Sequence, residues 1–410
     1  MKHLPEDFIT QMRGLLGEPM LRSYLQAFDE ETPVSIRLNP QKTVGMTVCD
    51  GERVPWCADG WYLPRRPNFT CDPLLHAGCY YVQEAGSMFL WQALGQHLPQ
   101  RPVRALDLCA APGGKSTLLR TLLPEGSTLY ANEPVHQRAS ILAENVEKWG
   151  YSDCYVTNCY PRDYRKAKMR FDVILCDVPC SGEGMFRKDE ATIGEWSPQN
   201  VSRCSQLQRD IVSEAWSCLE EGGLLVYSTC TFNTQENEEN IRWLLDTYDA
   251  TVLPVSTEAE WHITGSLLSG FTEPVYRFIP GITRSEGLFL CVLRKGRQEV
   301  VCATETGRLR HRNKPFAPQK QAVCVTETKL RHVDAPAVEL TYAEAMAYLR
   351  REALTLPPDT PRGLVEVRFL GHGLGTVKNI GNRANNLYPK EWRIKTTHIP
   401  EEYETILRPA

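Results

Sequence analysis

The stretch ALDLCAAPGGKS, residues 105–116, decides the fold. It places two consecutive glycines directly after a β-rich run and before a helical segment. Glycine lets the backbone come close to a ligand, and the first turn of a helix offers free N–H groups to a carboxylate or a phosphate. A nucleotide P-loop would need glycine five residues before Gly114, where Cys109 stands, and the dinucleotide pattern GxGxxG is absent.

Outward from this loop, short β-rich runs alternate with helical segments. This order predicts a doubly wound, mostly parallel sheet with helices on both faces. Gly222 and Gly223 are expected to end the last helix before its strand. Two later runs, separated by a turn through Gly281, predict an antiparallel pair at one edge of the sheet. The expected strands are residues 103–108, 128–133, 154–157, 171–177, 224–228, 275–279 and 287–293, and the expected helices include 135–149 and 206–219.

Glu133 indicates which ligand the glycine loop binds. It ends the second run, TLYANE, 26 residues after Asp107. An acidic residue in that place can accept hydrogen bonds from ribose hydroxyls, and the ligand of a doubly wound sheet lies across the carboxyl ends of its strands. The pattern therefore predicts a Rossmann-like, class I methyltransferase fold with S-adenosylmethionine (SAM) as cofactor.

Two cysteines follow neighbouring strands of the predicted sheet. Cys180 stands in DVPCSG after the fourth run, and Cys230 stands in STCT after the fifth. If the first and fourth strands flank the point at which strand order reverses, both sulfurs lie at the cofactor edge. A thiolate that adds to carbon 6 of a cytosine pushes electron density onto carbon 5, which is otherwise a poor nucleophile. On these grounds either cysteine could be the attacking group.

Asp177 precedes Cys180 by three residues and could stabilise N3 as the cytosine ring loses its aromaticity. The second cysteine could help when the carbon 5 proton leaves and the thiolate is expelled. SAM itself supplies the electrophile, so this chemistry requires no metal, and its sulfonium charge favours a nearby thiolate. Amino-methyltransferases usually carry an Asn/Asp-Pro-Pro-aromatic turn here; a sulfur in place of the aromatic ring favours methylation of carbon.

Length and composition indicate a multidomain protein of the cytoplasm. The chain has 410 residues, 42% of them hydrophobic and 23% charged, which is typical of a soluble protein of two or three domains. Neither a signal peptide nor a membrane span is recognisable, so we expect no membrane partner. The 15 cysteines have no zinc-finger spacing and are expected to be free thiols. We expect a monomer that binds no metal.

Positive charge gathers toward the C-terminus, although the formal net charge is −4. Residues 294–332 hold ten Lys or Arg against three Asp or Glu, and residues 362–395 hold seven against two. A basic rear half fits a nucleic-acid partner. We expect an α-rich N-terminal extension that supports the enzyme or binds RNA, a catalytic domain, a basic linker with an imperfect repeat at 301–312 and 323–333, and a small C-terminal RNA-binding domain that opens with a helix at 342–352. Their expected bounds are residues 1–100, 101–296, 297–337 and 338–410.

These motifs resemble the RsmB/RsmF family of SAM-dependent RNA (cytosine-5) methyltransferases. The similarity covers about residues 30–295. A further segment, FLGHGLGTVKNIGNRANNLYP at 369–389, resembles the PUA-like C-terminal region of the F-type branch, which modifies small-subunit ribosomal RNA. The matching segments are SIRLNP (35–40), YVQEAGSM (81–88), LDLCAAPGGKS (106–116), FDVILCDVPCSGEGMFRKD (171–189), WSPQN (196–200) and LVYSTCTFNTQENEENI (225–241).

The resemblance implies a role for each cysteine: Cys230 attacks carbon 6 and Cys180 assists product release. DNA cytosine methyltransferases use their Pro-Cys cysteine as the nucleophile, so this order rests on the resemblance alone. The family often has an aspartate near the adenine amine where this chain has Tyr160, and we expect Asn158 or Asp163 to replace it. The implied SAM contacts are Cys109, Ala110, Ala111, Pro112, Gly113, Gly114, Lys115, Glu133 and Asp177.

The resemblance makes 16S rRNA the expected substrate. Transfer RNA is the alternative, and a ribosome-assembly factor that binds RNA without catalysis is the alternative from another class. Basic side chains would bind backbone phosphate, and the target base must be flipped out of its stack to reach the sulfur. We expect RNA contacts from Arg37, Arg187 and Lys188.

Overall fold

The computed structural model describes residues 3–296 and 335–410. The expected basic linker, with its imperfect repeat, therefore lies almost wholly outside the described residues. No helix in the described ranges combines the length and the apolar character that a membrane crossing requires.

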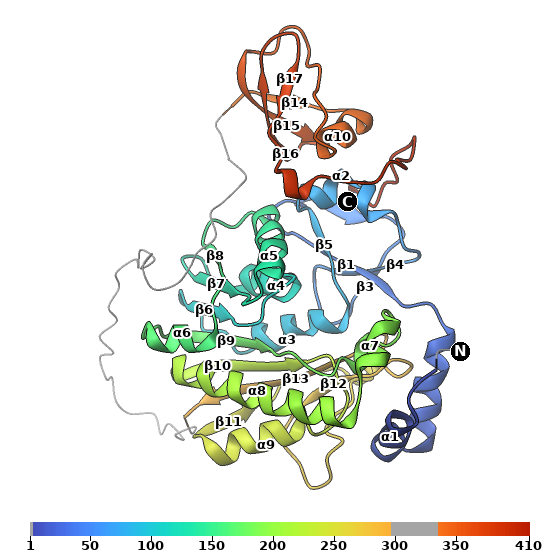
Figure 1. Ribbon diagram of the computed structural model, residues 1–410, viewed down its shortest axis with the longest axis vertical. Helices are drawn as coiled ribbons and strands as arrows, with labels where there is room; N and C mark the ends of the chain where they lie inside the picture. The colour runs from blue at the N-terminus through green and yellow to red at the C-terminus, as the bar shows by residue number, and fades with distance from the viewer. Residues whose placement is uncertain (1–2, 297–334) are drawn as a thin grey trace.

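The central sheet has its strands in the order β11-β13-β10-β9-β6-β7-β8, with β12 paired to β13 beside this path. Within the group β6 to β10, every pair of adjacent strands is parallel. This confirms the predicted doubly wound sheet (Figure 1). The first of them, β6, lies between β7 and β9, so the strand order reverses where expected. The bounds are β6 Arg104–Asp107, β7 Thr128–Asn132, β8 Cys154–Thr157, β9 Phe171–Asp177, β10 Leu219–Thr229, β11 Ala250–Leu253, β12 Tyr276–Phe278 and β13 Leu288–Lys295.

Helices cover both faces of the sheet because successive residues of each strand point to opposite sides. Ala105 and Val173 join the core under α3 and α4, whereas Leu106 and Ile174 join the core under α6, α8 and α9. Figure 1 shows α3, α4 and α5 on one side and α6, α8 and α9 on the other. The bounds are α3 Leu90–Gly95, α4 Gly114–Leu122, α5 His136–Trp149, α6 Pro161–Lys166, α7 Glu190–Glu195, α8 Pro198–Cys218 and α9 Glu238–Thr247.

Three details of the sheet differ from the prediction. Helix α8 begins earlier than expected because Ser197 accepts a hydrogen bond from the Asn200 N–H and caps it. Gly222 does not end that helix; it lies with φ +75° inside β10, where the register shifts between Leu219 and Leu224. The antiparallel pair β12–β13 is confirmed, but β13 lies inside the sheet because β11, which was not predicted, forms the edge.

The N-terminal extension is less helical than expected. It opens with helix α1 (Glu6–Gln26), but most of the rest is organised around a four-stranded antiparallel sheet in the order β3-β4-β1-β5. These strands are only two to five residues long. They are too short to show an alternating strand pattern in this Trp- and Pro-rich sequence. The bounds are β1 Val34–Leu38, β2 Met46–Val48, β3 Glu52–Arg53, β4 Gly60–Leu63, α2 Pro73–His76 and β5 Tyr80–Val82.

The C-terminal domain packs on the N-terminal extension instead of standing apart. Its sheet, β14-β15-β16-β17, and helix α10 share one hydrophobic core with β1, β4 and α2. The last strand, β18, pairs antiparallel with β2, close to the other end of the chain. The predicted helix at 342–352 is present but ends earlier. The bounds are β14 Ala337–Glu339, α10 Tyr342–Leu349, β15 Gly363–Phe369, β16 His372–Asn379, β17 Ala384–Asn386 and β18 Leu407–Pro409.

Candidate active site

The two cysteines meet at the carboxyl ends of adjacent strands. Strands β9 and β10 are parallel, with Asp177 opposite Ser228 in the register, so the chains that follow them leave the sheet side by side. The Sγ atoms of Cys180 and Cys230 lie 3.1 Å apart. The structure thus confirms that residues fifty positions apart in the sequence are neighbours in space.

The two loops that carry these cysteines are joined along their backbones. The Gly184 N–H donates to the Cys230 carbonyl at 2.8 Å, and the hydroxyls of Ser181 and Thr231 are 2.9 Å apart. A Cβ at position 184 would lie 2.8 Å from that same carbonyl oxygen. Only glycine therefore permits this close approach of the two loops.

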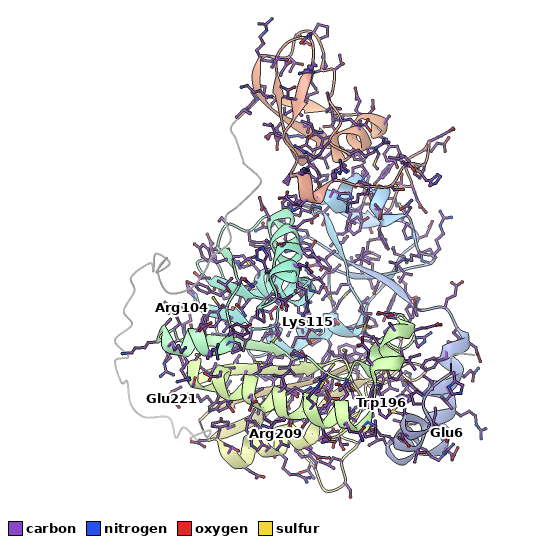
Figure 2. The ribbon with its side chains drawn as sticks, viewed as in Figure 1. Glu6, Arg104, Lys115, Trp196, Arg209 and Glu221 are labelled. Atoms are coloured by element: carbon purple, nitrogen blue, oxygen red, sulfur yellow. The ribbon has the colours of Figure 1, made fainter. Side chains whose placement is uncertain are left out.

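Asp177 ends β9 and is held in place by two side chains. Its Oδ2 lies 2.9 Å from Lys115 Nζ, and its Oδ1 accepts a hydrogen bond from Ser228 at 2.8 Å. Lys115 comes from the first turn of α4, and Figure 2 shows it in the middle of the molecule. Burial alone would lower the pKa of Lys115, but the carboxylate of Asp177 raises it above its usual value. The two side chains therefore form an ion pair whose ammonium and carboxylate both act on Cys230.

The surroundings of the two thiols are unlike. The hydrogen bond with Cys230, together with burial, raises the pKa of Cys180 well above its usual value. The pKa of Cys230 is lowered because Cys180 donates to its sulfur and Lys115 is near, and these effects outweigh burial and the charge of Asp177. These directions favour Cys230 as the thiol that ionises and Cys180 as the one that retains its proton.

The glycine loop between β6 and α4 suits a ligand with a carboxylate. Gly113 adopts φ +116°, and no side chain caps α4 within the described residues, so the first N–H groups of the helix have no side-chain acceptor there. Residues 109–115, all of the expected loop contacts, lie in this turn. Next to it, Asp107 accepts a 2.6 Å hydrogen bond from Ser116, and burial, then Asp177, raises the pKa of Asp107 to about 7.

Glu133 follows β7 directly and is 2% exposed. One of its oxygens accepts from the Val135 N–H at 2.9 Å, and the other lies 3.2 Å from the Arg138 guanidinium. A carboxylate has about four acceptor positions, so ribose hydroxyls can still be bound. The uncapped helix, the glycine turn and this carboxylate together fit SAM.

The two candidates for the missing aspartate differ in position. The Asn158 amide donates to the Glu133 carbonyl at 2.6 Å, so its oxygen is held next to the expected adenosine site. Asp163 accepts from the Tyr160 N–H at 3.0 Å at the start of α6. Tyr160 itself is 58% exposed. Of the two, Asn158 is the one that contacts Glu133, and its role at the adenine stays a prediction.

Two of the three expected RNA contacts are wrong. Arg37 is fully buried, donates to Gln83, Gly114 and Thr117, and lies over the ring of Trp149. The Arg187 side chain is 6% exposed and forms an ion pair with Glu286. Both guanidinium groups are buried and bind other parts of the protein, so neither is available to a phosphate. Lys188 alone is exposed.

Two buried carboxylates of the site were not predicted. Glu183 accepts from the Phe232 and Asn233 N–H groups and from the Trp196 indole at 3.0 Å. Glu236 accepts from the Ser181 N–H at 3.0 Å. Figure 2 shows Trp196 beside α1, whose apolar side packs on the same loops. Glu236 stands in strongly polar sequence, which is usually exposed, and Glu183 stands between two glycines. Neither setting signals a buried carboxylate.

Comparisons with known proteins identify the family of this chain. The family described as 16S rRNA methyltransferase RsmB/F matches residues 97–294, the N-terminal domain of 16S rRNA methyltransferase RsmF matches 4–85, and the methyltransferase RsmF PUA domain matches 335–394. The chain is 33% identical to ribosomal RNA small subunit methyltransferase F of Shigella dysenteriae serotype 1 (strain Sd197) over 408 residues, which is 93% of this chain and 81% of the relative. The protein of the same name from Escherichia coli O81 (strain ED1a) gives the same identity and coverage over 405 residues.

Solved structures share the fold. A methyltransferase homologue from Pyrococcus horikoshii aligns with TM-score 0.59 at 27% identity, over 71% of this chain and 95% of that one. NSun6 from Pyrococcus horikoshii, solved with SFG, aligns with TM-score 0.58 at 18% identity over 72% and 100%, which supports the fold alone. Fold and site together define a Rossmann-like methyltransferase. The chain belongs to the RsmB/F family of 16S rRNA methyltransferases and is of the F type.

Proposed function

We propose that this protein transfers a methyl group from SAM to carbon 5 of a cytosine in 16S rRNA, in the cytoplasm, through a covalent bond between Cys230 and carbon 6. The observation that carries the proposal is the 3.1 Å approach of Cys180 and Cys230 beside Lys115, Asp177 and the glycine loop. The names of the relatives, ribosomal RNA small subunit methyltransferase F, support the choice of rRNA.

The first step forms a bond between the Cys230 thiolate and carbon 6. The carbon 5–carbon 6 double bond opens, and its electrons move into the ring toward carbon 5 and N3. N3 takes up a proton from water, and Asp177, anchored by Lys115 and Ser228, stabilises it by accepting its hydrogen bond. N3 returns that proton to water when the ring is restored. SAM, when bound, supplies the methyl group that carbon 5 attacks.

The second half of the reaction reverses the addition. The carbon 5 proton passes to water, the carbon 5–carbon 6 double bond forms again, and the carbon 6–sulfur bond breaks with its electrons on Cys230. The Cys180 thiol keeps its proton and donates it in a hydrogen bond to the departing thiolate. Such a bond to an ionised acceptor is stronger than a neutral one, so Cys180 assists release.

Replacement of each cysteine by alanine tests these roles. Cys230→Ala should form neither 5-methylcytosine nor a covalent complex, whereas Cys180→Ala should accumulate a protein–RNA adduct that survives denaturing electrophoresis. If Cys230→Ala kept its activity, and Cys180→Ala lost activity without an adduct, the two roles would be reversed. Full rescue of a deletion strain by the inactive Cys230→Ala protein would instead favour a non-catalytic assembly factor.

The RNA substrate needs a separate experiment. Bisulfite sequencing of rRNA and tRNA from cells with and without the gene should show one cytosine of 16S rRNA that loses its methylation in the deletion. Loss of a tRNA site with the rRNA unchanged would replace the proposed substrate by tRNA and leave the chemistry at Cys230 untouched.

A further inference from the structure

The peptide groups on both sides of Cys180 are held by one pair of buried side chains. Gln208, from α8, donates through Nε2 to the Pro179 carbonyl at 2.9 Å. The Ser181 N–H donates to Glu236 Oε2 at 3.0 Å. The same Gln208 amide also donates to that Glu236 oxygen at 2.7 Å. Gln208 and Glu236 therefore form a clamp around the backbone of Cys180.

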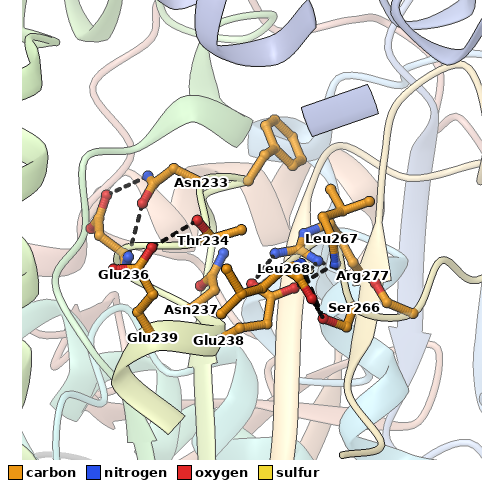
Figure 3. Close-up of polar contacts among 12 residues, drawn as sticks. Asn233, Thr234, Glu236, Asn237, Glu238, Glu239, Ser266, Leu267, Leu268 and Arg277 are labelled. Carbon is orange, nitrogen blue, oxygen red and sulfur yellow. Dashed lines mark hydrogen bonds and ion pairs between the residues drawn. The ribbon is translucent and has the colours of Figure 1, made fainter. Parts of the chain in front are cut away.

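The clamp is rigid because further hydrogen bonds hold the side chains of both Gln208 and Glu236. Glu236 Oε1 accepts from the Asn233 amide at 2.8 Å, as Figure 3 shows. Gln208 Oε1 accepts from the Tyr227 hydroxyl at 3.0 Å and from the Asn240 amide at 2.8 Å. Glu236 and Gln208 are both fully buried. A fully satisfied buried network of this kind restricts movement and specifies one geometry.

Glu236 has no cationic ion-pair partner in the described part of the chain. Among residues 3–296 and 335–410, no lysine or arginine makes an ion pair with this carboxylate. Burial raises the pKa of Glu236, while the hydrogen bonds from Ser181 and Asn233 oppose that rise. An acceptor held by neutral donors exerts its negative charge on its surroundings, and this charge raises the pKa of Cys180.

We propose that Glu236, with Gln208 as its partner, is the positioning residue of Cys180: it fixes the thiol against the sulfur of Cys230 and keeps a negative charge behind it. The part that Cys180 plays in catalysis, and with it the catalytic role of Glu236, rests on the proposed function.

The groups that face the two sulfurs are distributed unevenly. Cys180 is faced by Cys230, Glu236 and Tyr227. Cys230 also has Lys115 and Asp177 as charged neighbours, and their effects on its pKa oppose each other. The charge of Glu236 raises the pKa of Cys180. It therefore favours the protonated form of Cys180, which is the form that can donate to the departing thiolate.

Thiol alkylation tests the proposal without RNA or SAM. In a Cys230→Ala background, which removes the coupling between the sulfurs, the rate of Cys180 alkylation by iodoacetamide is followed by mass spectrometry between pH 6 and 10. Glu236→Gln removes the charge and keeps the shape. It should raise the rate at pH 8 about tenfold, the effect of one pKa unit on the thiolate fraction. An unchanged rate would overturn the proposal.

Glu183→Gln is the matched control, because Glu183 is another buried carboxylate that binds the same loops. It should destabilise the protein and leave the alkylation of Cys180 within about twofold, well below the one-unit effect. An equal rise in both variants would mean that loosened loops, not the charge, expose the thiol, and would also overturn the proposal.

Gln208→Met separates position from charge and serves if Glu236→Gln does not fold. It frees the Pro179 carbonyl but retains the carboxylate, so the alkylation rate should stay low while the covalent RNA adduct accumulates in the protein with both cysteines. Rapid alkylation in this variant would contradict the proposal. If the unaltered enzyme made no 5-methylcytosine at all, the proposed function would fail, yet the alkylation result would still decide the role of Glu236.

Discussion

The guanidinium of Arg37 donates a 2.6 Å hydrogen bond to the Thr117 hydroxyl, across eighty residues of sequence. Arg37 belongs to β1 of the N-terminal extension, and Thr117 to the first turns of α4, directly behind the glycine loop. A second hydrogen bond from Arg37 reaches the Gly114 carbonyl at 3.2 Å. The extension therefore takes part in shaping the cofactor site.

Arg37→Met should weaken both folding and SAM binding. Removal of the guanidinium leaves buried acceptors on Gln83 and Gly114 without a donor, which costs about 3 kcal/mol of unfolding free energy. The dissociation constant for SAM should rise about tenfold, or about 1.4 kcal/mol. Urea denaturation and titration calorimetry measure the two effects. Arg53→Met, an exposed arginine of β3 that lies over Trp61, is the control. Loss of stability with an unchanged SAM affinity would make Arg37 a purely structural residue.

Lys115→Met should shift the ionisation of Cys230. Lys115 lowers the pKa of Cys230, and the thiolate, not the thiol, is the nucleophile in alkylation. Without the ammonium group, the curve of Cys230 alkylation against pH should move to higher pH, and the reaction at neutral pH should slow by about tenfold. Lys188→Met removes an exposed lysine as the comparison. A curve that does not move would show that the cysteine pair alone sets the acidity.

Asp107→Asn should change how stability depends on pH. The pKa of Asp107 is raised to about 7 in the folded protein, so the folded state holds a proton that the unfolded state releases near pH 4. The stability contributed by this proton is complete below about pH 4 and is lost as the pH rises through 7. Asparagine does not titrate, so the variant does not lose this stability as the pH rises. Its unfolding free energy relative to the unaltered protein should improve by about 2 kcal/mol between pH 5 and 8.

Chemical denaturation at several pH values gives this comparison. Asp210→Asn, which removes an exposed carboxylate of α8, controls for the change in net charge. If the difference between the Asp107→Asn and unaltered proteins stayed constant with pH, the proton would not reside on Asp107.

Arg277→Met should be among the most destabilising single changes. Arg277 and Glu238 are both fully buried and joined by two 2.8 Å hydrogen bonds, drawn in Figure 3. Breaking a buried pair strands the remaining charge and costs about 3–5 kcal/mol. A double variant, Arg277→Met with Glu238→Gln, should recover part of that loss in urea denaturation. No recovery would show that the packing of the arginine, and not the stranded charge, dominates.

The sequence predicted the positions of the two cysteines better than those of the side chains that surround them. Cys180 and Cys230 could be placed together because each follows a strand whose order in the sheet obeys a general rule. Arg37 could not be placed correctly, because its partners lie 46 and 80 residues away and only packing brings them together. Glu236 stands in a run of charges that usually faces water. The edge strand Ala250–Leu253 is four residues long and has too few positions to show a period.

The β2–β18 pairing and the core common to both ends of the chain have a consequence for proteolysis. A single cut introduced between residues 297 and 334 would leave two pieces that still share that core and that strand pair. We expect the nicked protein to elute as one particle and the two pieces, produced separately, to reassemble when mixed. The C-terminal piece would then be an exchangeable subunit of the enzyme rather than a removable appendage.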